Sequence, residues 1–294
     1  MPSLKDIRKR VTSVKNTQKI TRAMKLVAAA KLRRAQGAMM ELRPYAEKYR
    51  EMLSSLVDAS GGAGDAAHPL LETREGHAHV AILAISSDRG MCGGFNSNIQ
   101  KTVVHYAKTV AEEGREAIVF PLGRRMTQFV NKSDMNVGRE LGEVIAGAST
   151  DSIKSITSVL VDGFLKGEFD DVVIISNRFD SIISQNPRVT DLLPVAAVTE
   201  DLEHAESVRG DYLYEPDQET LLNHVVPAFV EVQIREAILE SIAGEHAARM
   251  NAMNSATDNA TEMISALTLQ LNRARQAAIT TELMEIIGGA EALK

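Results

Sequence analysis

Apolar side chains spaced three and four residues apart open the chain and continue far along it. Leu4, Ile7 and Val11 share one face of a helix, and the stripe shifts sideways around the helix at later positions. We expect one helix over about residues 3–57, which Pro44 would bend at most. At 1.5 Å per residue, about 55 residues form a rod of roughly 80 Å.

A second long helical pattern closes the chain, over about residues 218–287. Asp217 is expected to cap its start, Pro227 to kink or divide its first turns, and Gly288-Gly289 to stop it. Small and aliphatic residues repeat at 4-3-4-3-4 spacing, which is typical of a coiled-coil seam. The seam consists of Ala260, Ile264, Leu267, Leu271, Ala274 and Ala278.

The middle of the chain has a different period. Short continuous apolar runs are typical of strands buried on both faces, and they alternate here with helical patterns. Alternation of this kind predicts an α/β domain with a mainly parallel sheet. Glycines and a proline mark residues 58–78 as a flexible linker before it. The expected strands are 80–85, 117–120, 172–175 and a weaker 195–198, and the expected helices are 97–113, 124–131 and 150–166.

Neither long helix can bury its apolar stripe alone, so we expect the two to pair antiparallel as a shaft protruding from the α/β domain. The predicted fold is therefore a Rossmann-like α/β domain plus a long antiparallel coiled coil. Its segments are a shaft helix (1–57), a linker (58–78), a central domain (79–208) and a second shaft helix (209–294). Surplus apolar side chains are expected to point outward and to need a further partner. They are Met250, Met253, Met263, Met284, Ile286 and Ile287.

Charge is distributed unevenly along the chain. Residues 1–34 hold eleven Lys or Arg and one acid, a net +10, so the remainder of a chain with total charge −6 carries −16. This asymmetry indicates an acidic partner near the N-terminal helix. Nucleic acid is disfavoured, because an apolar stripe interrupts the basic residues and no helix-turn-helix or zinc pattern is present. No stretch is apolar enough for a membrane span, and the start lacks a secretory signal core.

The glycine-rich loop at 86–96 is the main candidate for chemistry. A loop of this kind between strand and helix can hold phosphate, but its spacing matches neither the dinucleotide fingerprint nor the P-loop. We favour a tight structural turn and keep a nucleotide-binding enzyme as the alternative. Cys92, the only cysteine, lacks a base for nucleophilic catalysis, and the seven histidines are scattered. We expect no cofactor, no metal and no catalytic site.

Four sequence strings together resemble the gamma subunit of F-type ATP synthases. They lie in order at both ends and in the middle of the chain, which makes the resemblance specific. The strings are 5–8 with 13–31 at the start, 87–96 in the middle, and 248–260 and 272–283 near the end.

The resemblance implies a non-catalytic rotor subunit. In that family the paired terminal helices turn inside a ring of three alpha and three beta subunits, while the α/β domain stands with epsilon on the membrane c-ring. Turning the asymmetric shaft would couple proton-driven rotation to ATP synthesis or hydrolysis in the ring.

The resemblance also implies site residues, matched by position. The expected contacts with the alpha/beta ring are Met24, Arg249, Arg275, Gln276, Thr280 and Glu282. Those expected at the foot, near epsilon and the c-ring, are Tyr212, Tyr214 and Glu215. For Met24 and Thr280, plain coiled-coil packing is an equal alternative. For Arg275 and Glu282, the alternative is a surface ion pair of little energetic worth.

One departure from the family pattern is informative. Chloroplast members carry an inserted segment with a redox-active cysteine pair, whereas this chain has a single cysteine and no such insert. With no transit peptide either, we expect a bacterial protein on the cytoplasmic face of the inner membrane. A generic coiled-coil adaptor or nucleic-acid binder remains the second alternative.

Overall fold

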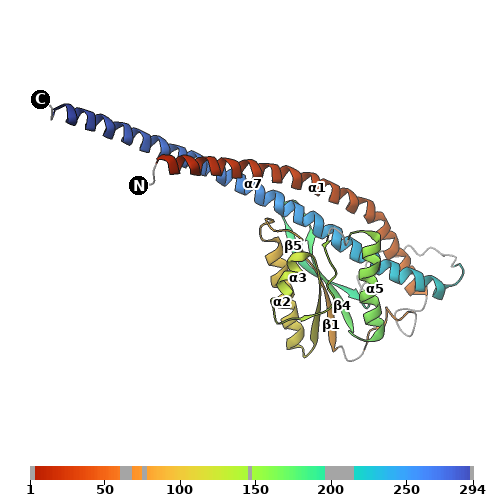
Figure 1. Ribbon diagram of the computed structural model, residues 1–294. Coiled ribbons are helices and arrows are strands. Elements are labelled where there is room, and N and C mark those ends of the chain that lie inside the picture. The colour runs from red at the N-terminus through yellow and green to blue at the C-terminus, as the bar shows by residue number, and fades with distance from the viewer. Residues whose placement is uncertain (1–3, 60–67, 75–77, 145–147, 196–214, 292–294) are drawn as a thin grey trace. The chain divides into compact units, whose positions relative to one another are not determined.

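The computed structural model describes residues 4–59, 68–74, 78–144, 148–195 and 215–291. These residues form two compact units, one of residues 29–248 and one of both chain ends, up to residue 28 and from 249 onward. Two helices, α1 (Leu4–Ala59) and α7 (Gln218–Glu291), run unbroken from one unit into the other (Figure 1). They contain 56 and 74 residues, far more than the usual globular helix.

The larger unit is built on a five-stranded sheet in the order β3-β2-β1-β4-β5. Its first four strands are parallel and only β5 runs antiparallel, so the predicted mainly parallel sheet is confirmed. The central strand β1 is buried almost throughout, which explains its continuous apolar sequence. The strands are β1 (His79–Ile85), β2 (Glu116–Leu122), β3 (Asn136–Val137), β4 (Asp171–Phe179) and β5 (Gln185–Leu193).

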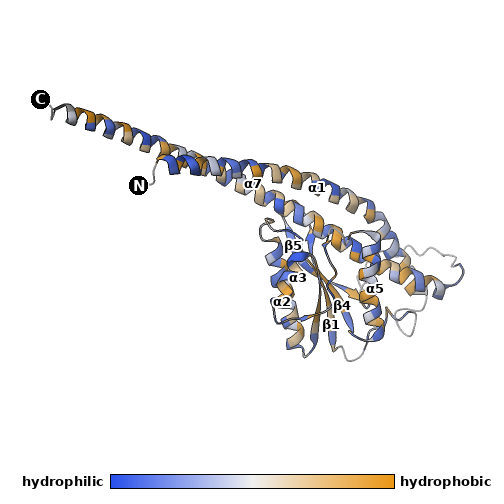
Figure 2. Ribbon diagram, in the orientation of Figure 1, coloured by the Kyte–Doolittle hydropathy of each residue, from blue (hydrophilic) through white to orange (hydrophobic). Residues whose placement is uncertain are grey.

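Alternate residues of the strands enter two separate cores, one on each face of the sheet. Leu83 and Ile174 face a core completed by α5 (Thr150–Lys166), the end of α1 and the start of α7. Ile82 and Val173 face the other core, completed by α2 (Phe95–Glu112) and α3 (Arg124–Val130). Figure 2 shows the apolar colouring concentrated on the strands and the inner sides of these helices. Because successive side chains of a strand point to opposite faces, each strand contributes to both cores and joins the two helix layers.

The expected helices of the middle agree with α2, α3 and α5 to within two residues. The predicted fourth strand at 195–198 is wrong at Val195, which lies in a turn, while 196–198 are outside the described residues. The strand in this region is β5, at Gln185–Leu193. It was missed because β5 is a half-exposed outer strand with polar residues and Pro187, and therefore has no continuous apolar run.

Two expectations about α7 are also wrong. Gly288 and Gly289 do not stop the helix, which continues to Glu291, because glycine costs a helix only about 1 kcal/mol. Pro227 was expected to kink or divide the first turns, and the division is wrong, since one missing hydrogen bond is tolerated in a helix packed on a core. The predicted cap is confirmed: the Thr220 amide donates to Asp217 Oδ1 at 2.8 Å, and this bond lowers the pKa of Asp217.

The burial of particular side chains contradicts two further expectations. Leu70 and Leu71, in the predicted flexible linker, are 1% and 3% exposed and join the core beside α5, because a surface segment can still contribute apolar anchors. Met253, expected to point outward, is 7% exposed, because its turn of α7 faces inward in the paired helices. Met263, Met284, Ile286 and Ile287 are exposed as expected, and Met250 is half-buried.

Candidate partner-contact surfaces

The unit of chain ends is a pair of antiparallel helices. Within this unit, side-chain hydrogen bonds join α1 to α7, and residue numbers rise on one helix as they fall on the other. Among them, the buried hydroxyls of Thr21 and Thr257 satisfy each other, which lets the helix backbones approach closely. The pairs are Gln18 with Thr261 at 2.7 Å, Thr21 with Thr257 at 2.8 Å and Lys25 with Asn254 at 2.6 Å.

The predicted seam lies on the side of α7 that is turned toward the inside of the helix pair. Ala260 is buried, and the other five seam residues, from Ile264 to Ala278, are half-buried, while most of their neighbours are exposed. On α1, Ile7 and Val11 are buried at 2% and 8% exposed. Alanine and isoleucine at these positions bury modest area per turn and produce a slim rod.

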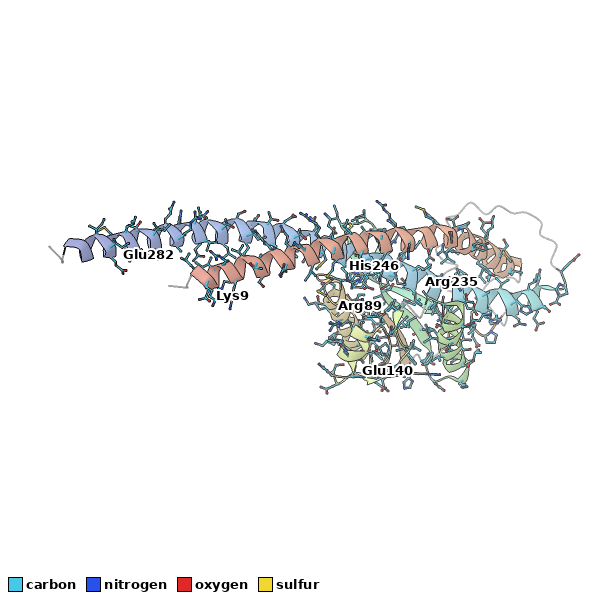
Figure 3. All side chains as sticks on the ribbon, turned by 45° about the horizontal axis from the view of Figure 1, so that its top comes forward. Lys9, Arg89, Glu140, Arg235, His246 and Glu282 are labelled. Atoms are coloured by element: carbon cyan, nitrogen blue, oxygen red, sulfur yellow. The ribbon has the colours of Figure 1, made fainter. Side chains whose placement is uncertain are left out.

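The end of α7 has apolar side chains with no cover inside the described chain. Ile279, Leu283, Met284, Ile286 and Ile287 are 49% to 67% exposed. Figure 3 shows Glu282 on α7 past the start of α1, where Lys9 lies. Contiguous apolar exposure of this kind marks a surface that meets another molecule.

The expected ring contacts fall into two groups. Arg275, Gln276, Thr280 and Glu282 are exposed on this end of α7, where a partner can reach them. The Thr280 hydroxyl also donates to the backbone carbonyl of Gln276 at 2.9 Å.

The other expected contacts are placed differently. Met24 is half-buried beside the Thr21 level of the helix pair, and Arg249 is only 8% exposed, so less of each faces outward. At the foot, Glu215 is exposed, while Tyr212 and Tyr214 lie outside the described residues.

The glycine-rich loop is a structural turn, as predicted. Ser87 and Asn96 fasten it, because the Ser87 hydroxyl and amide both donate to Asn96 Oδ1, at 2.8 and 3.1 Å. Gly93 adopts a φ of 59°, and Cys92 is buried rather than exposed for reaction. Asp88 Oδ1 accepts hydrogen bonds from the amides of Arg124 and Val144, both at 3.2 Å. Through these hydrogen bonds the loop joins β1 to its neighbours.

The nucleotide-binding alternative is also disfavoured by what covers the sheet. In doubly wound sheets, ligands bind beyond the carboxyl ends of the strands where the strand order reverses, here between β1 and β4. Asn177 near that end of β4 is 1% exposed. A Cβ added to Gly244 of α7 would lie 3.2 Å from the Phe95 ring and 3.8 Å from Asn177 Cβ. Helix α7 and Phe95 therefore occupy the crevice where a nucleotide would sit.

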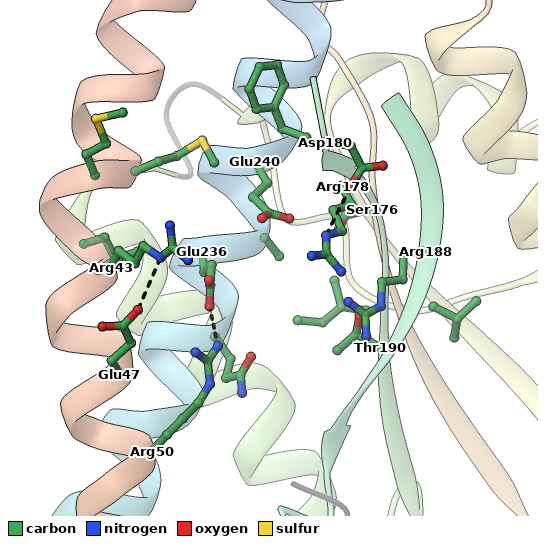
Figure 4. A pocket seen from close by; sticks show the side chains of 18 of the residues that line it. Arg43, Glu47, Arg50, Ser176, Arg178, Asp180, Arg188, Thr190, Glu236 and Glu240 are labelled. Atoms are coloured by element: carbon green, nitrogen blue, oxygen red, sulfur yellow. Dashed lines mark hydrogen bonds and ion pairs between the residues drawn. The ribbon is translucent and has the colours of Figure 1, made fainter. Parts of the chain in front are cut away.

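A cleft of about 830 Å³ opens in the larger unit between α1, α7 and the β4–β5 edge of the sheet (Figure 4). Ion pairs line it: Arg50 of α1 pairs with Glu236 of α7 at 2.9 Å. Glu240, one turn further along α7, faces Arg178 and Arg188 of the strands. Burial, and secondarily the nearby Glu236 carboxylate, raise the pKa of Glu240 to about 7. Sequence reasoning missed this cleft, because its walls come from segments far apart in the chain.

Metal and membrane sites are not indicated by the described residues. In the described ranges, no group of three or more His, Cys, Asp or Glu is arranged to hold a metal ion. None of the helices in those ranges has the length and apolarity required to cross a membrane.

Known proteins resemble this chain in sequence and in structure. The family model for ATP synthase matches residues 3–293. The ATP synthase gamma chain of Geotalea uraniireducens (strain Rf4) is 45% identical over 294 residues, covering all of both chains. That of Chlorobaculum parvum is 44% identical over 300 residues, again covering both chains completely.

Solved structures share the fold. A chain of the Euglena gracilis mitochondrial ATP synthase (OSCP/F1/c-ring, rotational state 3) has a TM-score of 0.65 at 21% identity, covering 99% of this chain and 94% of that one. A chain of the Tetrahymena thermophila mitochondrial ATP synthase central stalk/c-ring has a TM-score of 0.54 at 25% identity, covering 81% and 99%. With paired terminal helices, a Rossmann-like sheet and full-length identity of this level, the chain belongs to the ATP synthase gamma-chain family.

Proposed function

We propose that this chain is the central rotor shaft of a bacterial ATP synthase and has no catalytic site of its own. Its full-length identity of 45% to a bacterial gamma chain carries this proposal. Its partners are then the alpha and beta subunits, which form a three-plus-three ring, together with epsilon and the c-ring. It is peripheral, on the cytoplasmic face of the bacterial cell membrane, and its proton-driven rotation alternates the catalytic sites of the ring.

The helices suit the transmission of torque. At 1.5 Å per residue, the 74 residues of α7 extend about 110 Å without a break. Twist applied at one end passes along successive backbone hydrogen bonds, and α1 stiffens the rod through the bonded Thr21 and Lys25 levels.

The free end of α7 suits a bearing that faces different subunits in turn. Its side chains differ around the helix, with exposed Ile279 and Leu283 on the same stretch as exposed Arg275 and Glu282. An asymmetric surface presents a different contact to each of three sites as it turns, whereas a symmetric one would present the same contact to all. We propose that Arg275, Gln276, Thr280 and Glu282, with Met24 and Arg249, act on the ring. Tyr212, Tyr214 and Glu215 then act at the foot.

Two measurements test this function. The tagged chain, expressed with its neighbours, is expected to co-purify with three alpha and three beta subunits; isolation without them refutes the assignment.

A chain ending at Ala274 lacks the exposed end of α7 but keeps every described residue of the sheet unit. Coupled ATP synthesis in vesicles should fall while epsilon stays bound. Loss of epsilon with normal turnover contradicts the shaft role.

A further inference from the structure

The cleft of Figure 4 has charged walls and a polar floor. Helix α1 contributes Arg43 and helix α7 contributes Glu240, while Ser176, Arg178 and Thr190 lie on the strands. Ser176 and Arg178 alternate with residues of the opposite core, so their side chains share the sheet face that packs on α1 and α7. All of these residues belong to the same compact unit.

Glu240 differs from the other acids of this cleft, of which Asp191 is exposed on β5. Glu47, Glu236 and Asp180 each pair with an arginine, at 3.2, 2.9 and 3.3 Å. No residue in the described ranges hydrogen-bonds to Glu240 or lies within ion-pairing distance of it, although it is half-buried. A carboxylate in that position is desolvated, and the charges of Arg178 and Arg188 offset only part of that cost. A cation brought to it therefore gains more than one brought to an exposed, already paired acid.

The free edge of β5 forms part of the same cleft. Four consecutive β5 residues, 188–191, line it. Since consecutive strand residues point to opposite faces, a cleft lined by all four must run along the edge of the strand. Among the described strands, β5 pairs only with β4, so its outer backbone groups face this space over about 10 Å. Such an edge can accept an added extended segment.

We propose that this cleft is a docking groove for an extended segment of a partner subunit, which adds to the edge of β5 and places a lysine or arginine against Glu240. The inference rests on the proposed function, since the partner is another subunit of the same assembly. Met39 and Met40 of α1 also line the groove, and their flexible side chains fit a neighbouring apolar residue of the segment.

The charges of the groove favour a basic segment over an anion. Four arginines and five acids line the groove, and three of each form ion pairs. Among the described lining residues this leaves the charge of Arg188 against those of Glu240 and Asp191, an excess of one negative charge that favours a cation. The charged groups that surround Glu240 in the groove come from each of the elements packed there. They are Arg43, Glu47 and Arg50 on α1, Glu236 on α7, Arg178 on β4, Asp180 just after β4, and Arg188 and Asp191 on β5.

Photo-crosslinking in the assembled complex tests the proposal. The photoreactive residue p-benzoylphenylalanine replaces Thr190, which is half-buried in the groove. The complex is purified through its alpha and beta subunits, irradiated at pH 6 and pH 8, and the adducts are mapped by mass spectrometry. We expect one adduct, on a segment of another subunit that contains a Lys or Arg. Its yield should be up to about tenfold higher at pH 8, because a carboxyl with a pKa near 7 is mostly protonated at pH 6.

Matched variants separate the outcomes. Glu240→Gln should reduce the adduct at pH 8 and remove its pH dependence. Glu47→Gln, which makes the same change at an acid already paired with Arg43, should do neither. Adducts confined to this chain, or an adduct unaffected by Glu240→Gln, overturn the docking groove. If the chain fails to co-purify with alpha and beta, the proposed function fails instead. Normal co-purification of each variant shows that it has folded.

Discussion

Replacing Glu240 with glutamine changes one charge in the larger unit and keeps the shape of the side chain. In the folded chain the carboxyl has its pKa raised from 4.5 to about 7, mainly by burial. The folded state therefore binds this proton more tightly than the unfolded state. The stability that the protonated group contributes is fully present below pH 4.5, declines as pH rises toward 7, and is absent above that.

The size of the effect follows from the shift. A change of about 2.5 pKa units corresponds to a ceiling of about 3 kcal/mol at 1.36 kcal/mol per unit. Because Glu240 is only half-buried, solvent screening reduces this, and we expect about 1–2 kcal/mol. Glutamine carries no charge at any pH. Glu240→Gln should therefore be more stable than the parent by that amount at pH 8 and about equally stable at pH 4.5.

Urea unfolding of the full-length chain, followed by circular dichroism between pH 4.5 and pH 8, measures this difference. The control is Glu47→Gln, whose acid is exposed on α1 and pairs with Arg43. Its stability difference from the parent should stay within about 0.5 kcal/mol across the range. If Glu240→Gln is less stable than the parent at pH 8, the burial argument is wrong, and the carboxylate must be engaged favourably in the folded chain.

Other predictions concern the bearing surface and the glycines. Replacing both Arg275 and Gln276 with alanine should slow coupled turnover by removing exposed contacts at the end of α7; unchanged ATP synthesis in vesicles rejects that role. Gly163→Ala should destabilise the chain by about 1–3 kcal/mol, because the new Cβ would lie 2.4 Å from the Phe169 ring. Gly37→Ala, also inside a helix but with nothing beyond the local helix backbone within 4 Å of its Cβ, should instead stabilise it by about 0.5–1 kcal/mol. Thermal melting of both glycine variants checks the contrast, and equal effects contradict it.

The tertiary structure differs from the expectations drawn from the sequence where packing outweighs local conformational preference. Gly288-Gly289 and Pro227 are helix breakers by composition, yet α7 includes them all. Leu70 and Leu71 lie in a polar, glycine-marked stretch, yet they are core residues. The local conformational preference of a residue type amounts to about 1–3 kcal/mol. The packing of a continuous helix or the burial of an apolar side chain can offset that amount.

Sequence matching placed Arg275, Gln276, Thr280 and Glu282 on the end of α7, and there the structure exposes them. Whether they contact the ring stays a prediction. Exposure could be foreseen because these residues lie outside the 4-3 seam, and helical periodicity alone fixes which positions share a face. The burial of Arg249 could not be foreseen, because it depends on what packs around it.

The sequence by itself determined the two long helices, their seam and the buried parallel strands. Hydrophobic periodicity predicts those features, because it shows which side of a segment faces apolar surroundings, whatever the partner is. Only the tertiary structure decided that α7 fills the crevice beside Asn177, that β5 is an outer strand, and that Glu240 lies in a cleft lined by arginines and acids. These depend on segments as far apart as residues 43, 188 and 240, and no local pattern encodes which distant charges share a desolvated space.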